Sequence, residues 1–104
     1  MDAFSTNIED TSSHKAYHDA ILDNKYLFEG KTVLHLTEGM NCLFSFFAVE
    51  AGCKKVYCVL NGKSEKEQQN IYMIKEIIKE NNKEQIIEAL SWSDFNAQVD
   101  IIIG

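Results

Sequence analysis

Short, uninterrupted apolar runs, separated by segments with helical spacing, constrain this fold more than any other feature. Three of them are Val33–Leu34, Val56–Leu60 and Ile101–Ile103. They lie in the expected strands Lys31–Leu36, Lys55–Leu60 and Val99–Ile103, and a weaker strand is expected near Ile86–Ala89. Strands that are continuously apolar, rather than alternating with polar residues, are typical of a parallel sheet. Four such strands separated by helices predict an α/β fold.

Helical spacing of apolar residues fills the segments before and between these runs. Helices are expected over 13–24, Cys42–Ala51 and 64–80. Ser64, with a glutamate three residues later, has the spacing of a capping box that opens the last helix. Gly52 is placed to end the middle helix in a left-handed conformation. Right-handed crossovers then predict the strand order 3-2-1-4, with helices mainly on one face.

One domain is expected, because the chain has 104 residues and 45% of them are apolar. The polar residues 1–12 are expected to form a flexible arm before a domain over 13–104. No apolar run approaches the ~20 residues that span a bilayer, so no membrane association is expected. Three cysteines without C-x-x-C spacing favour reduced thiols and a cytoplasmic or nuclear location.

The net charge of −6 and the absence of arginine limit the partners. Without guanidinium groups the chain lacks the forked donor preferred for phosphate. The acidic balance also disfavours direct nucleic-acid binding, which depends on neutralising phosphates. One small group of lysines forms a candidate basic patch, although a solvated face is the simpler interpretation; it consists of Lys54, Lys55, Lys63 and Lys66.

Two groups of histidines and cysteines are candidates for metal or thiol chemistry. His14 and His18 are four residues apart on a predicted helix. They are either a pair of metal ligands or two surface histidines. His35, Cys42 and Cys58 lie near predicted strand ends, where α/β sites form. No motif spacing supports a metal site. Cysteine is also commonly a small buried hydrophobe, so buried structural thiols are the simpler interpretation.

The stretch Leu43–Val59, with the sequence LFSFFAVEAGCKKVYCV, resembles the first helix and second strand of protein arginine methyltransferases. Lys31–Leu34 fits the lead into that family's first strand, and Val99–Ile103 resembles its fourth. The resemblance spans roughly 10–103. It implies a truncated half of the Rossmann-like methyltransferase fold, which in this family binds S-adenosylmethionine.

The first strand and the loop after it depart from the pattern that the resemblance implies. His35 stands where the family has an aspartate, and Gly39 alone remains of a G-x-G-x-G loop. Glycines let the backbone approach the cofactor without a Cβ clash. Glu38 adds negative charge where the methionine carboxylate of the cofactor would lie.

Other cofactor positions that the resemblance implies are also altered. Leu60 replaces the acidic residue that binds the ribose hydroxyls, and Asn61 beside it is the one conceivable substitute. Ser13 stands where an arginine pairs with the cofactor carboxylate. Ser91 and Trp92 take the place of an acidic pair near the adenine.

These losses predict that cofactor binding is gone. Each lost hydrogen bond to a charged group costs about 1.5–3 kcal/mol, so four approach the ~8 kcal/mol of a micromolar affinity. We therefore expect no cofactor, metal or catalytic residue. The expected role is a pseudoenzyme, a non-catalytic protein-binding or regulatory subunit of a larger complex with a methyltransferase or a ribonucleoprotein assembly. The alternative is an S-adenosylmethionine-dependent subunit whose partner completes the active site.

The predicted sheet has one poorly covered face and one open edge. The connection 89–98 is too short for a crossover helix, and it brings few apolar side chains as cover. A protein partner or a second copy is expected to cover this region, unless the helix over 13–24 does so. The candidate interaction surface consists of Trp92, Phe95, Val99, Ile101 and Ile103.

Overall fold

The computed structural model describes residues 14–38, 41–61 and 64–104. A helix over residues 14–23 comes first. The elements after it are η1 (Lys25–Leu27), β1 (Thr32–Thr37), α2 (Leu43–Glu50), β2 (Lys55–Leu60), α3 (Glu65–Glu80), β3 (Ile87–Ser91), η2 (Trp92–Asp94) and β4 (Ile101–Ile103). All strand pairs are parallel, in the order β3-β2-β1-β4, so the predicted fold class and strand order are confirmed.

The start of β4 differs from the expected strand Val99–Ile103. Asp100 is tied twice to the first residue of β1: its backbone N–H donates to the Thr32 carbonyl at 2.8 Å, and its carboxylate accepts from the Thr32 N–H at 2.9 Å. This clamp bends the chain before Ile101, so regular pairing begins two residues later than predicted.

Two helix boundaries follow the local signals in the sequence. The Ser64 hydroxyl accepts a hydrogen bond from the Glu67 N–H at 3.2 Å and caps α3. The Glu67 carboxylate accepts from the Asn70 side chain at 3.3 Å. Gly52 follows α2 with a φ of +95°, a region that side chains disfavour. Both predicted boundaries are therefore confirmed.

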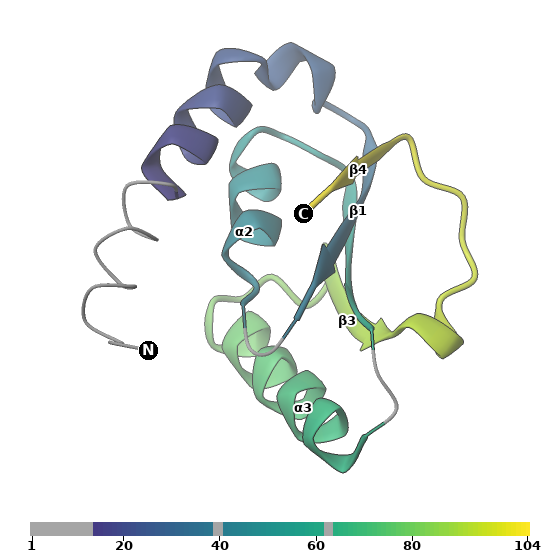
Figure 1. Cartoon of the computed structure of the whole chain (residues 1–104). Coiled ribbons are helices and arrows are strands. Elements are labelled where there is room, and N and C mark those ends of the chain that lie inside the picture. Colours follow the sequence, from purple (N-terminus) through teal and green to yellow (C-terminus); the bar gives the residue numbers. More distant parts are fainter. Residues whose placement is uncertain (1–13, 39–40, 62–63) are drawn as a thin grey trace.

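Helices α2 and α3 cover the same face of the sheet (Figure 1), as the right-handed crossovers predict. The α3 stripe Ile71, Ile74 and Ile78 is buried in one core cluster with residues of β2 and β3. Burying such a side chain contributes about 1.5–3 kcal/mol, so this stripe is a main source of stability. Within the described residues no helix combines the length and apolar character needed to cross a membrane.

Among the described residues, the segment around and after η2 covers the opposite face of the sheet (Figure 1). Phe95 meets the Tyr57 ring edge-on, with centroids 5.5 Å apart, and Trp92 stacks on Phe95 at 5.8 Å. Leu36 and Ile102 stay exposed on the sheet. This thin cover leaves part of the face open to solvent.

The helix over residues 14–23 packs against α2 and leaves the open face uncovered (Figure 1). Tyr17 stacks on Phe44 with centroids 4.0 Å apart, and the His18 Nε2 lies 2.8 Å from a Glu50 carboxylate oxygen. The alternative in which this helix covers the open face is therefore wrong. Its physical reason is α2 itself, which is apolar on almost every side and offers aromatic partners.

Candidate functional site

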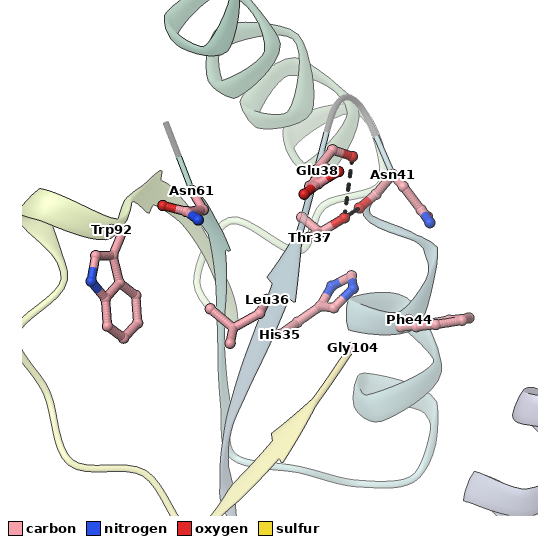
Figure 2. Close-up of a pocket in the computed structure, with 9 residues that line it drawn as sticks. All are labelled: His35, Leu36, Thr37, Glu38, Asn41, Phe44, Asn61, Trp92 and Gly104. Atoms are coloured by element: carbon pink, nitrogen blue, oxygen red, sulfur yellow. Dashed lines mark hydrogen bonds between the residues drawn. The ribbon is translucent and has the colours of Figure 1, made fainter. Parts of the chain in front are cut away.

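A cavity of about 600 Å³ lies at the carboxyl ends of the strands (Figure 2). This is the edge where open α/β sheets bind ligands. The loops after β1, β2 and β3, the first turns of α2 and the end of β4 contribute to it. Its lining consists of His35, Leu36, Thr37, Glu38, Asn41, Phe44, Asn61, Trp92 and Gly104.

The polar groups of the loop after β1 hold the loop itself. The Thr37 hydroxyl reaches the Asn41 carbonyl at 2.6 Å and the Glu38 carbonyl at 3.4 Å (Figure 2). The Asn41 side-chain oxygen accepts from the Leu43 N–H at 3.3 Å, next to the start of α2. Gly39, which the sequence assigned to the cofactor loop, lies outside the described residues.

His35 is almost completely buried and belongs to a small polar cluster under the cavity. Its Nδ1 lies 2.7 Å from the Ser45 hydroxyl and 3.8 Å from the Cys58 sulfur. Burial lowers the pKa of His35 to about 4 and raises the pKa of Cys58 to about 12. At neutral pH the imidazole and the thiol are both uncharged, so Cys58 is not an activated nucleophile.

The charge of the cavity disfavours an anionic ligand. Glu38 is the one ionised side chain among the described lining residues, and none of these carries a positive charge. A carboxylate or phosphate is normally held by arginine, lysine or a cluster of N–H donors. The residues described here therefore offer no partner for a carboxylate such as that of S-adenosylmethionine, and they suit a neutral or cationic group better.

The structure places some of the predicted cofactor positions at the cavity and buries others in the core. Leu60 is buried in the helix-side core, whereas Asn61, the next residue, lines the cavity. Ser91 is buried, and its hydroxyl donates to the Asp94 carboxylate at 3.1 Å, while Trp92 lines the cavity with 51% of its surface exposed. Ser13 lies outside the described residues. Thus Asn61 and Trp92 reach the cavity, and Leu60 and Ser91 do not.

Some lining residues were not predicted to line a cavity. The helical spacing of Phe44 favoured a core position over an aromatic binding platform, but Phe44 lines the cavity and its ring also stacks on Tyr17. Gly104 lies so close to β1 that a Cβ there would stand 2.8 Å from the Leu36 carbonyl oxygen. Only knowledge of the β1–β4 pairing could have indicated that contact.

The candidate metal groups of histidines and cysteines do not assemble. Among the described residues no group of three or more potential ligands comes together. His18 pairs with Glu50, and the His14 ring packs against Phe44 at 5.6 Å. His35 and Cys58 do approach each other, and all three cysteines are buried free thiols.

The described lysines of the candidate basic patch do not lie together. Lys54 and Lys55 lie at the start of β2, whereas Lys66 is in the first turn of α3, beyond the end of that strand. A strand of six residues spans about 20 Å, so the two groups sit at opposite ends of the sheet. Lys63 lies outside the described residues.

The predicted interaction surface needs a correction in β4. Trp92 is exposed, and Phe95, Val99 and Ile101 are partly buried. Ile103, with 7% exposure, belongs to the core, while its neighbour Ile102 is 64% exposed. Successive side chains of a strand point to opposite faces, and Ile101 and Ile103 share the helix-covered face. Ile102 therefore lies on the open face, whereas Ile101 and Ile103 do not.

Two curated proteins resemble this chain in sequence. Protein arginine N-methyltransferase PRMT10 of Arabidopsis thaliana is 33% identical over 93 residues, which cover 86% of this chain and 22% of that protein. Ribosomal protein arginine N-methyltransferase rmt3 of Schizosaccharomyces pombe is 43% identical over 54 residues, which cover 52% of this chain and 10% of that protein. No protein-family model matches the chain.

Solved structures agree with these relatives. The crystal structure of Arabidopsis thaliana protein arginine methyltransferase 10 superposes with a TM-score of 0.66 at 32% identity, over 85% of this chain and 24% of that one. A Trypanosoma brucei PRMT1 enzyme-prozyme heterotetrameric complex with AdoHcy gives 0.68 at 29%, over 91% and 29%. A putative RNA methyltransferase from Pyrococcus horikoshii, at 24% identity and 0.63, over 88% and 43%, shows the fold alone.

The strand order and these similarities show that the chain has a truncated form of the Rossmann-like methyltransferase fold. The predicted relationship to protein arginine methyltransferases is confirmed by both kinds of comparison. The chain spans about a fifth or less of the length of the curated relatives it matches.

Proposed function

We propose that the chain is a non-catalytic, protein-binding subunit related to arginine methyltransferases. One observation carries this proposal: among the described residues, the cavity where relatives would hold S-adenosylmethionine offers Glu38 and no positive charge. The uncharged His35 and the core position of Leu60 support it, because neither supplies a carboxylate for the cofactor.

The partner that we propose is a catalytically complete arginine methyltransferase in the cytoplasm or nucleus. The similar Trypanosoma brucei protein is known as an enzyme–prozyme heterotetramer, which supports a related arrangement here. The exposed Trp92 and Ile102 offer apolar surface for such a contact. A ribonucleoprotein assembly is the other partner class that a pulldown from native extract would reveal.

A second candidate function is a subunit that binds S-adenosylmethionine and shares an active site with its partner. The cavity of about 600 Å³ and the presence of Asn61 and Trp92 in its lining favour this candidate. The amide of Asn61 could bind a ribose hydroxyl, and the indole of Trp92 could stack on a base.

Calorimetric titration with S-adenosylhomocysteine separates the two candidates. We expect no binding by this chain up to about 1 mM, with a full-length arginine methyltransferase as the positive control. The titration is then repeated on the complex that this chain forms with the full-length arginine methyltransferase. One ligand site per pair supports the non-catalytic subunit. Micromolar binding by the chain alone, or a second site in the complex, contradicts it.

A further inference from the structure

We propose that Asn61 is a site of spontaneous deamidation, which converts its side-chain amide into a carboxylate at the cavity. Asparagine is a chemically labile residue, and the reaction is fastest where glycine follows it. Asn61 is the only asparagine of the sequence that precedes a glycine, Gly62. The second reactant is water, so the modification needs no enzyme. This inference goes beyond the proposed function, because it depends neither on a partner protein nor on a cofactor.

The reaction uses the backbone nitrogen of the residue that follows the asparagine. That nitrogen attacks the side-chain carbonyl carbon, a new C–N bond closes a succinimide ring, and the bond to the side-chain nitrogen breaks, so ammonia leaves. Water then opens the ring at either carbonyl and gives aspartate or isoaspartate. The amide and water thus become a carboxylate and an ammonium ion, without oxidation or reduction. Glycine favours the attack because no Cβ crowds its nitrogen.

The end of β2 leaves the Asn61 side chain accessible to this chemistry. Leu60 is the last residue of β2 and pairs with Ser91 of β3, so Asn61 stands just beyond the paired part of the sheet. Asn61 itself belongs to neither a helix nor a strand, and it is exposed. Its side chain lines the cavity (Figure 2). Water therefore reaches the amide, and the backbone is not fixed by a helix or a strand ladder at this residue.

Three asparagines in or beside helices are held by hydrogen bonds of their side-chain amides. Those of Asn24 and Asn81 donate to the carbonyls of Ala20 and Ile77, both at 2.8 Å. Asn70 is buried, and its amide donates to a carboxylate at 3.3 Å. Each of these amides has to break its hydrogen bond before it can turn toward the main chain. They should therefore react more slowly than Asn61.

Asn96 separates the effect of exposure from the effect of sequence. It is exposed and lies outside helices and strands, as Asn61 does, but Ala97 follows it. The methyl group of alanine hinders attack by the alanine nitrogen. Asn96 should therefore deamidate more slowly than Asn61 in the same molecule and under the same conditions.

The product changes the charge of the cavity. Glu38 is the one ionised side chain among the described lining residues, so a carboxylate at position 61 adds a second negative charge. Two like charges in one cavity repel an anion more strongly and attract a cation. In the isoaspartate form the Cβ also enters the main chain, which lengthens the connection between β2 and α3. Deamidation therefore alters the electrostatics of the cavity and the covalent path of the chain beside it.

Peptide mass spectrometry of the full chain, incubated at mildly alkaline pH, tests the proposal. We expect the peptide that contains Asn61 to gain the mass difference between an amide and an acid with time, while the Asn96 peptide stays largely unmodified. Ion exchange should resolve the product as a species that is one charge more negative than the parent. Gly62→Ala should slow its appearance, and Asn61→Gln should abolish it, because glutamine has to close a larger ring. Asn96→Gln is the matched control and should react like the parent chain.

The same measurement on the chain unfolded in guanidinium chloride shows whether the fold permits the reaction. We expect the Asn61 rates of the native and unfolded protein to be of similar size. A native chain that keeps Asn61 intact while the unfolded chain loses it would overturn the proposal, as would equal rates at Asn61 and Asn96. Binding of S-adenosylhomocysteine is measured on freshly purified, unmodified chain, so its outcome contradicts or supports the proposed function alone.

Discussion

The Nδ1 of His35 lies 2.7 Å from the Ser45 hydroxyl, and this contact joins β1 to α2 inside the core. Both side chains are almost completely buried, and the Cys58 sulfur lies 3.8 Å from the same nitrogen. Buried polar groups are stable only when they are hydrogen-bonded. The cluster therefore links strand and helix at the base of the cavity, and its protonation state matters for folding.

Stability should fall in mild acid because His35 is held neutral. Burial lowers the pKa of His35 from 6.5 to about 4, so the unfolded chain takes up a proton more readily than the folded one. The contribution is complete above pH 6.5 and is lost as the pH falls toward 4, up to about 3 kcal/mol. Urea unfolding at pH 7 and pH 4.5 measures it.

The variant His35→Gln removes the titrating group and should flatten this pH dependence, while His14→Gln should keep it. An unchanged slope in His35→Gln would show that another group is responsible.

Removing both partners of this contact together should cost less than the sum of the two single removals. Ser45→Ala leaves the buried imidazole without its closest partner and should cost about 1–3 kcal/mol. His35→Leu with Ser45→Ala leaves no unsatisfied polar group, so the double variant should be more stable than the sum of the single changes implies. A thermodynamic cycle from urea unfolding provides the coupling energy, and strict additivity would contradict the contact.

Two glycines allow backbone strain to be separated from crowding. Gly30 and Gly52 both have positive φ, +70° and +95°. A Cβ at Gly30 meets nothing within 4 Å, whereas one at Gly52 lies 3.2 Å from the Glu29 Cγ. Gly30→Ala should cost about 1–2 kcal/mol from conformation alone. Gly52→Ala should cost more, as measured by thermal unfolding; equal losses would mean that Glu29 moves away freely.

The cap of α3 should contribute measurably to stability. Ser64→Ala removes the acceptor of the Glu67 N–H and should destabilise the protein by about 1 kcal/mol. Ser64→Asp should retain the cap, because a carboxylate also accepts this hydrogen bond and favours the helix N-terminus. Equal stability of the alanine and aspartate variants, measured by urea unfolding, would contradict this role.

The strand order was predictable because short apolar runs alternate with helices, and right-handed connections leave few topologies. The face of the sheet on which each side chain lies was harder to predict. Three consecutive isoleucines contain no polar residue that marks a face, so the sequence could not show that Ile102 is exposed and Ile103 buried. In the same way, the polar Asn61 reaches the cavity, whereas the apolar Leu60 packs into the core.

The lysine patch failed for a different reason. Residues close in sequence were separated by the length of β2, which is a property of extended backbone and not of charge. For His35 and Cys58, the sequence predicted only that both lie near the same edge of the sheet. Its distances depend on the pairing of β1 with β2, where the two residues are direct neighbours in register.

Trp92, the sole tryptophan of the chain, stands half in solvent at the cavity and rests on Phe95. Indole emission changes when water leaves the ring or a neighbouring group quenches it. The protein thus carries its own optical probe at the place where ligands would enter. Any compound that settles beside Leu36 can be followed by fluorescence, without a dye and without disturbing the fold.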